Sequence, residues 1–257
     1  MNGGHAHHHH LYLPGSSPLH RLPPQCKLVA SLAFVLVVVA TPRGQFWAFG
    51  AYAGLLGVVA LLAHVPVGLV LRRMVVEAPF VVFAFLLPFV SRGDQVDVLG
   101  MELSESGLLG AWNILAKGSL GVIASILLIA TTEPRSLLLG LERLRMPQLM
   151  VQIMQFMFRY LDVISSEMHR MRIARESRAF EARTLRNLGV IAHSAGALFI
   201  RSYERGERVH LAMLSRGYNG TMPAIIDVSA GRRSWAAAAV LPGVALAIAT
   251  SAWITQR

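Results

Sequence analysis

The sequence has little charge and almost no cysteine for its length of 257 residues. Only 15% of its residues are Asp, Glu, Lys or Arg, against about 25% in an average soluble domain. The single cysteine, Cys26, excludes a disulfide within the chain and a cysteine-rich zinc site. Low charge together with 54% hydrophobic residues excludes a disordered chain, because disorder needs low hydrophobicity and high net charge. The composition therefore argues against an ordinary soluble enzyme.

The sequence also lacks the short motifs that mark common catalytic sites. It contains no GxxxxGK[ST] phosphate-binding loop, so we do not expect the chain to bind ATP itself. The motifs HExxH, GxSxG and CxxC are missing too, and nothing supplies a nucleophile or a set of metal ligands. An integral membrane enzyme is therefore disfavoured, and no cofactor is expected.

Five apolar runs approach or reach the roughly 20 residues that a helix needs to cross a bilayer. They lie at residues 27–41, 46–63, 74–90, 107–130 and 235–254. The first two runs are short and adjacent, so a helical hairpin that does not fully cross is an alternative for them. Glu77 and Lys117 lie inside apolar runs, where an ionisable side chain is either functional or paired with a partner, and we favour a structural role. The sequence predicts an all-α integral membrane protein with about five membrane helices.

The basic residues predict how the chain is oriented. A net charge of +10 would suit a nucleic-acid-binding protein, but in so apolar a chain it indicates basic cytoplasmic loops. Arg21 and Lys27 precede or begin the first run, and Arg72 and Arg73 lie between the second and third. Placing them in the cytoplasm puts the N-terminus inside and makes residues 91–106, which hold four acids and one arginine, an outer loop.

A long basic segment at 131–233 separates the last two runs and carries 16 of the 24 Lys and Arg residues. After Pro147, which suits a helix start, apolar residues recur in steps of three and four, the pattern of an amphipathic helix. This first stripe consists of Ile153, Met154, Met157, Leu161, Ile164, Met168 and Met171. A second helix is predicted from about 185 to 204, with a stripe of Leu188, Ile191, Ala192, Ala195, Leu198 and Phe199.

Each predicted long helix is followed by a short basic segment, at 172–178 and at 207–220. Two solvated helix ends would explain these charges. The pairing instead favours a scaffold that presents two similar basic segments to two similar partners. Gly217, directly after Arg216, is expected to end its helix, because glycine adopts the left-handed conformation that helix termini use.

Three stretches carry a resemblance to a known family. Residues 205–220, RGERVHLAMLSRGYNG, resemble the second coupling motif of the transmembrane T component of energy-coupling-factor (ECF) transporters. Ala174-Arg175-Glu176 resembles the first motif, with Glu176 where glycine is commoner. Residues 17–28, SPLHRLPPQCKL, are similar to the family's N-terminal signature in the cobalt/nickel (CbiQ-like) branch. The resemblance extends over about residues 11–257.

The resemblance implies a non-catalytic transporter subunit that docks on two ECF-type ATPase subunits and holds a substrate-binding membrane subunit. It places Ala174, Arg175 and Glu176 in a groove of one ATPase, and Ala212, Arg216 and Gly217 in a groove of the other. Contacts to the substrate-binding subunit would come from Met150, Met154, Met157 and Leu161. The remaining partner is the lipid bilayer of a bacterial or archaeal cell (inner) membrane, crossed several times, and no nucleic acid is expected.

The organisation implied is a polar, His-rich N-terminal segment at 1–27, membrane helices one to four at 28–130, a cytoplasmic coupling-helix region at 131–233 and a C-terminal membrane helix at 234–257. Uptake of cobalt, or nickel, is the expected function. A vitamin ECF T component and a self-sufficient secondary transporter are alternatives, although the latter would show internal repeats and broken helices. Metal binding is conceivable at His5, His7, His8, His9 and His10, since neutral imidazoles ligate such ions, but a tract without that role is the simpler interpretation.

Overall fold

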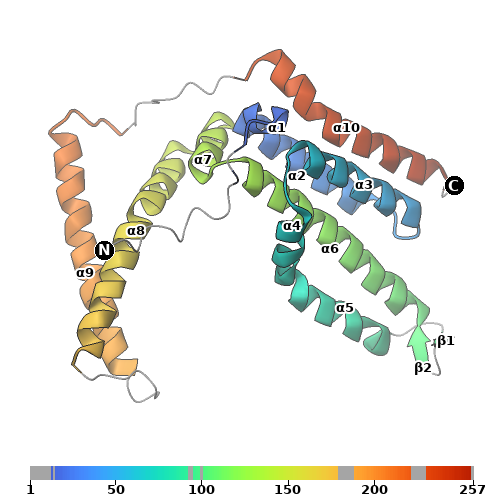
Figure 1. Cartoon of the computed structure of the whole chain (residues 1–257), viewed down its shortest axis with the longest axis horizontal. Helices are drawn as coiled ribbons and strands as arrows, with labels where there is room; N and C mark the ends of the chain where they lie inside the picture. Colours follow the sequence, from blue (N-terminus) through green and yellow to red (C-terminus); the bar gives the residue numbers. More distant parts are fainter. Residues whose placement is uncertain are drawn as a thin grey trace. The chain divides into compact units, whose positions relative to one another are not determined.

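The computed structural model describes residue 13 and residues 15–91, 95–98, 101–178, 188–220 and 230–255. The chain divides into two compact units. Met1–Leu144 with Val228–Arg257 form the membrane-helix unit, and Arg145–Asp227 form the long-helix unit. Figure 1 shows that the described elements are almost all helices, with one short strand pair.

The membrane-helix unit is built from apolar helices. Its elements are α1 (Pro18–Arg21), α2 (Pro24–Ala40), α3 (Phe46–Leu62), α4 (Val67–Arg73), the 3₁₀ helix η1 (Met74–Glu77), α5 (Ala78–Val90), α6 (Glu105–Thr131), α7 (Pro134–Arg143) and α10 (Arg232–Thr255). Three segments, Val67–Val90, Glu105–Thr131 and Arg232–Thr255, are long and apolar enough to cross a membrane, whereas α2 and α3 are shorter. The prediction of an all-α membrane protein is confirmed, and each predicted apolar run is helical.

The predicted outer loop at 91–106 contains an element that the sequence interpretation missed. Strands β1 (Gln95–Val98) and β2 (Met101–Ser104) pair antiparallel, with Gln95 opposite Ser104. Both strands alternate apolar and polar residues, QVDV and MELS, which is the strand period. Each strand is only four residues long, which is too short for the alternation to distinguish a strand from a loop.

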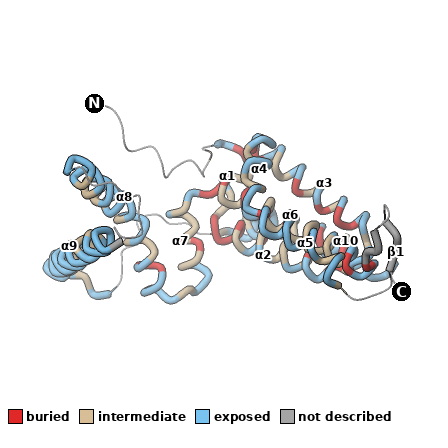
Figure 2. Tube along the Cα trace, turned by 90° about the horizontal axis from the view of Figure 1, so that it is seen from below, coloured by how far each residue is buried: buried red, intermediate tan, exposed pale blue. Residues whose placement is uncertain are grey.

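The core of the membrane-helix unit lies where α2, α3, α6 and α10 meet. Phe34, Phe49 and Tyr52 are buried there, with the Phe34 and Tyr52 rings edge-to-face at a centroid distance of 6.0 Å. The Tyr52 hydroxyl lies 2.9 Å from Thr41 Oγ1 and 3.4 Å from the carbonyl oxygen of Ala245, so its polar tip is satisfied inside an apolar cluster. One aromatic side chain therefore ties α3 to the end of α2 and to α10, and Figure 2 shows the buried positions along these helices.

Two lysines of this unit bind helix ends. Lys27 donates to the carbonyl oxygen of Thr131 at 2.9 Å and to the Thr132 hydroxyl at 3.2 Å, at the C-terminus of α6. Lys117 donates to the carbonyl oxygens of Val39 and Thr41 at 2.7 and 2.9 Å, where α2 ends. Terminal carbonyls of a helix lack intrahelical partners and carry partial negative charge, so an ammonium group stabilises them. Lys117 thus has the structural role that was expected of it.

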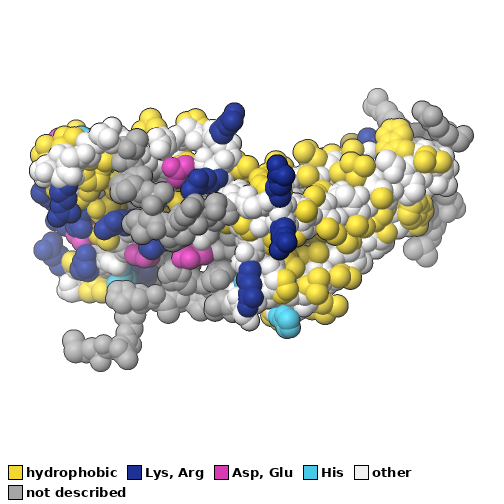
Figure 3. Space-filling model, turned by 90° about the horizontal axis from the view of Figure 1, so that it is seen from above, with side chains coloured by type: hydrophobic (Ala, Val, Ile, Leu, Met, Phe, Trp, Pro, Cys, Tyr) yellow, Lys and Arg dark blue, Asp and Glu magenta, His cyan; other side chains and the backbone are white. Residues whose placement is uncertain are grey.

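Close helix crossings in this unit depend on glycine. A Cβ at Gly107 of α6 would lie 2.8 Å from Pro88 Cα of α5, and one at Gly140 of α7 would lie 2.9 Å from the backbone nitrogen of Gln25 in α2. Small residues allow membrane helices to approach in this way. Outside these contacts, many large apolar side chains are exposed, and Figure 3 shows hydrophobic side chains over much of the visible face of this unit. Such a surface suits contact with lipid.

The long-helix unit contains α8 (Gln148–Glu176) and α9 (Leu188–Leu214). Helix α8 begins directly after Pro147, as predicted. Helix α9 is longer than the predicted 185–204 and continues to Leu214, so most of the second basic segment is helical and does not follow the helix. The physical reason is that only Gly206 interrupts the helix formers there, and one interior glycine costs only about 1 kcal/mol. In the described part of 131–233, regular structure is helical throughout.

Candidate functional site

Helices α8 and α9 run antiparallel and are joined near the middle of the pair by an ion pair. Glu167 of α8 accepts hydrogen bonds from Arg201 of α9 at 2.8 Å and from Arg170 of its own helix at 2.6 Å. The bonds from Arg170 and Arg201 hold the pKa of the Glu167 carboxyl below its usual range. The contact joins the two long helices through a carboxylate that stays ionised at neutral pH.

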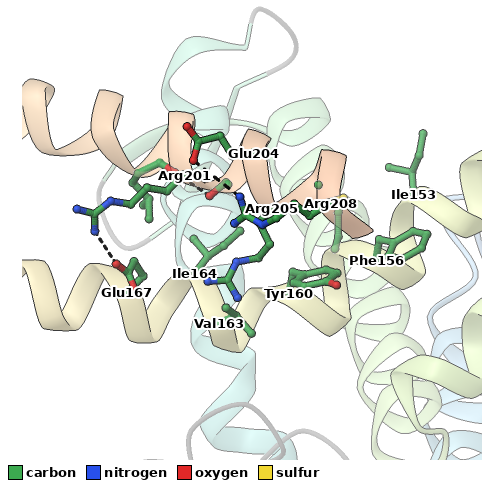
Figure 4. A pocket seen from close by; sticks show the side chains of 14 residues that line it. Ile153, Phe156, Tyr160, Val163, Ile164, Glu167, Arg201, Glu204, Arg205 and Arg208 are labelled. Atoms are coloured by element: carbon green, nitrogen blue, oxygen red, sulfur yellow. Dashed lines mark hydrogen bonds and ion pairs between the residues drawn. The ribbon is translucent and has the colours of Figure 1, made fainter. Parts of the chain in front are cut away.

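A cavity of about 530 Å³ opens between α8 and α9 beside this ion pair. Figure 4 shows its two different walls. The wall from α8 is mostly apolar and includes Ile153, Phe156, Tyr160, Val163 and Ile164, whereas the wall from α9 carries Arg201, Glu204, Arg205 and Arg208. The rings of Phe156 and Tyr160 are stacked, with centroids 6.3 Å apart. The two helices therefore do not pack directly against each other over their whole length, because this cavity lies between them.

The first predicted site segment lies at the C-terminal end of α8. Ala174 and Glu176 are exposed and Arg175 is half-buried. The Glu176 carboxylate accepts a hydrogen bond from Arg172 Nε at 2.8 Å within the same helix, so its charge is already paired. The helix then ends through Ser177, whose hydroxyl donates to the carbonyl oxygen of Ala174 at 3.1 Å.

The second predicted segment lies at the C-terminal end of α9, with Ala212, Arg216 and Gly217 all exposed. Gly217 has a φ of 83°, the left-handed conformation expected of it. The backbone N–H groups of Gly217 and Tyr218 donate to the carbonyl oxygens of Leu214 and Met213, each at 3.0 Å. This pair of bonds is a Schellman motif, which satisfies two carbonyls that the helix end would leave unpaired. The prediction that Gly217 ends the helix is confirmed.

The two helix ends share a sequence repeat that the sequence interpretation missed. Ala-x-x-Ser-Arg occurs at 174–178 and again at 212–216. The Ser177 hydroxyl donates to the Ala174 carbonyl at 3.1 Å, and the Ser215 hydroxyl donates to the Ala212 carbonyl at 3.0 Å.

The backbone hydrogen bonds of the serine and of the arginine also match between the two repeats. Ser177 N–H donates to Ile173 and Ser215 N–H to Leu211, at 2.9 and 3.0 Å. The N–H of Arg178 and that of Arg216 each donate three residues back, both at 3.0 Å. By geometry, the counterpart of Arg216 is therefore Arg178, and Arg175 lies one turn earlier.

The apolar stripe of α8 is largely open to solvent in the isolated chain. Met150, Met157 and Leu161 are 55%, 64% and 43% exposed, and Met154 is half-buried. Long flexible thioether side chains can repack against a partner whose surface shifts. An exposed apolar stripe of this kind is suited to contact with protein or lipid.

The N-terminal histidines, His5 and His7 to His10, lie outside the described residues. Within the described ranges, no group of three or more His, Cys, Asp or Glu residues is arranged to hold a metal ion. Of the predicted site features, the two helix ends and the apolar stripe of α8 lie within the described residues.

Comparison with known sequences identifies the family of this chain. The model of the CbiQ family, described as "Cobalt transport protein", matches residues 15–225, which include both helix ends and all of α8 and α9. The chain belongs to the CbiQ family. The resemblance predicted from the sequence is confirmed. The match begins after the His-rich tract and ends before α10 of this CbiQ-family chain.

Individual relatives of the CbiQ-family chain come from archaea and bacteria. It is 33% identical over 171 residues to an uncharacterised protein of Methanocaldococcus jannaschii, covering 63% of this chain and 58% of that protein. It is also 26% identical over 224 residues to the energy-coupling factor transporter transmembrane protein EcfT of Bacillus subtilis, covering 81% and 83%. EcfT of Brevibacillus brevis is 28% identical over 230 residues, covering 81% and 83%. The chain thus spans less than two thirds of the first archaeal relative and most of each EcfT.

Proposed function

We propose that the chain is the T component of an ECF transporter, a non-catalytic membrane scaffold that transmits ATP hydrolysis by two partner ATPase subunits to a substrate-binding membrane subunit. The observation that carries the proposal is the pair of matching helix ends. Ala174 and Ser177 at the end of α8 repeat the bonding of Ala212 and Ser215 at the end of α9. Two equivalent exposed ends suit two similar partners.

The spacing of the two ends supports two separate docking sites. Tyr218 and Gly220, just after α9, are hydrogen-bonded to Gln152 near the start of α8. Arg178 lies at the other end of α8, so about 26 residues separate the ends along the helix. At 1.5 Å per residue this is about 39 Å. A separation of this size favours two docking sites over one.

The chemistry of each end suits a protein groove. A guanidinium group presents a rigid fork of donors that matches a carboxylate or the carbonyls at a helix C-terminus. The small side chains of Ala174 and Ala212 allow close approach of the partner. We propose that the first docking segment comprises Ala174, Arg175 and Glu176 extended to Arg178, and the second Ala212, Arg216 and Gly217.

The substrate-binding subunit is proposed to dock on the apolar stripe of α8. Met150, Met154, Met157 and Leu161 give this stripe an apolar surface of which most is exposed. Movement of the ATPases would displace the two helix ends and so alter the crossing of α8 and α9. The stripe would tilt with α8, which changes how the substrate-binding subunit is held.

We propose cobalt ion as the substrate of the whole transporter, with nickel as the nearest alternative, because the matching family is described as a cobalt transport protein. The test is to purify the complex from its native membrane, measure its bound metal, and follow uptake of radioactive cobalt into vesicles. Uptake is expected to require ATP and both ATPase subunits. Uptake without the ATPases would support a secondary transporter, and ATP-driven uptake of a vitamin but no metal would support the vitamin alternative.

The orientation of the chain gives a separate prediction. With the N-terminus in the cytoplasm, strands β1 and β2 are expected to face outside. A Gln95→Cys variant in a Cys26→Ser background should react with a membrane-impermeant maleimide in intact cells, because β1 then lies outside the membrane. A Ser177→Cys variant in the same background is the matched control and should react only after lysis. The reverse pattern of labelling would invert the proposed topology.

A further inference from the structure

The chain that leaves α9 is tied to the first part of α8 by one buried side chain. Gln152 is only 7% exposed, and both ends of its amide are used. Its Nε2 donates to the carbonyl oxygen of Gly220 at 2.8 Å, and its Oε1 accepts from the Tyr218 hydroxyl at 2.7 Å. Tyr218 is itself half-buried. We call Gln152, Tyr218 and Gly220 the α8–α9 tie.

The tie acts directly on the end of α9. Tyr218 is two residues after Arg216, and only Gly217 lies between them. Gly217, at a φ of 83°, turns the chain out of the helix. The Tyr218 N–H closes the Schellman motif on Met213, while the Tyr218 side chain is held by Gln152. The backbone N–H and the side chain of Tyr218 therefore both fix the direction in which the chain leaves α9. The backbone of Arg216, two residues earlier, is fixed with it.

The sequence has no tyrosine at the matching position after the first helix end. In the repeat, Phe180 occupies the position that matches Tyr218. A phenyl ring cannot donate to a glutamine oxygen, so the contact that orients the second segment cannot be duplicated by the residue at the matching position. The tie therefore distinguishes the second segment from the first, although the described bonds at the alanine, serine and arginine of the two repeats match.

We propose that Gln152 and Tyr218 are positioning residues that hold Arg216 in the orientation needed to dock on one ATPase, without contacting that ATPase themselves. The inference rests on the proposed coupling function of the second segment. A buried amide bonded on both sides is costly to leave unpaired, so the tie favours one arrangement over the alternatives. Helix α8, which also presents the apolar stripe, would then move together with the second docking segment.

The test is a double-mutant cycle on the full chain in lipid nanodiscs, with affinity for the purified ATPase pair as the readout. Tyr218→Phe should weaken ATPase binding about threefold to tenfold, the equivalent of one hydrogen bond. Combined with Arg216→Ala it should cause no further loss, because both changes act through one contact. Combined with Arg178→Ala the losses should multiply, because those sites are independent. Gln152→Met, which removes both hydrogen bonds of the amide, should behave like Tyr218→Phe.

Controls separate this inference from general loss of stability and from failure of the coupling proposal. Tyr203→Phe makes the same chemical change on an exposed part of α9 and should leave ATPase binding unchanged. If the Tyr218→Phe and Arg216→Ala losses multiply, Tyr218 acts independently of Arg216 and the positioning role is wrong. If Arg216→Ala weakens binding and Tyr218→Phe does not, the tie has no role but the coupling function stands. If Arg216→Ala has no effect, the coupling function of this segment fails.

Discussion

Replacing Arg178 and Arg216 together with alanine should abolish copurification of the ATPase subunits, while each single change should only weaken it. Breaking one partner of a charged contact buried at an interface costs about 2–5 kcal/mol, much of it from the unpaired partner charge. In a single variant, the remaining segment keeps the ATPases at high effective concentration, so a weakened complex survives. The double variant has lost both anchors. Because both arginines are exposed at helix ends, the membrane part should fold normally in every variant.

The same experiment decides between the two arginines of the first segment. The resemblance to the ECF family points to Arg175, whereas the repeated helix-end geometry points to Arg178. Arg175→Ala with Arg216→Ala is the matched control, and it should retain a weak complex if Arg178 is the docking residue. Arg178→Lys should not restore full binding, because an ammonium group cannot reproduce the guanidinium fork. If ATPases still copurify when all three arginines are replaced, these side chains are solvated helix ends and the coupling proposal is wrong.

Adding one methyl group at Gly107 should destabilise the membrane-helix unit. The new Cβ would lie 2.8 Å from Pro88 Cα and 3.0 Å from the carbonyl oxygen of Leu87, both of them backbone atoms of α5 that cannot rotate aside. Such overpacking costs about 1–3 kcal/mol, against a gain of about 1 kcal/mol that alanine normally brings inside a helix. The measurement is the midpoint of thermal unfolding in detergent, which Gly107→Ala should lower and Gly107→Leu should lower further.

Gly121 on the same helix provides the control for that prediction. Nothing lies within 4 Å of a Cβ added at Gly121, so Gly121→Ala should leave the midpoint unchanged or raise it. If the two alanine variants unfold alike, the close crossing of α5 and α6 does not contribute to stability as described. A Gly107→Ala variant that unfolds later than the unmodified protein would contradict the prediction outright.

Much of the architecture follows from the sequence because it depends on local patterns. Each apolar run becomes a helix, and the start of α8 after Pro147 follows from the missing N–H of proline. The end of α9 at Gly217 follows from the ease with which glycine adopts a positive φ. The family resemblance also rested on short linear stretches. None of these inferences needed to know which residues meet across the fold.

The sequence was less informative where a pattern is only a few residues long or is interrupted by a glycine. The strands at 95–98 and 101–104 alternate as strands do, but four residues are too few to distinguish from a loop. The extension of α9 to Leu214 crosses a glycine that local propensity alone would treat as a weak point. The repeat that makes Arg178 the counterpart of Arg216 is present in the sequence. Only the structure shows that the serines of both repeats make the same hydrogen bond.

The partners of individual polar side chains were decided by tertiary structure alone. Lys117 of α6 binds carbonyls at the end of α2, and Gln152 of α8 binds Tyr218 and Gly220 beyond the end of α9. Contacts of this kind depend on where helices distant in sequence cross. The periodicity of residues within one helix does not specify where it crosses another. The sequence by itself determined which segments form apolar helices, which form amphipathic helices, and to which family the chain belongs. The fold decided which helix ends are equivalent and which buried amide holds one of them in place, because those properties arise only when separate helices are brought together.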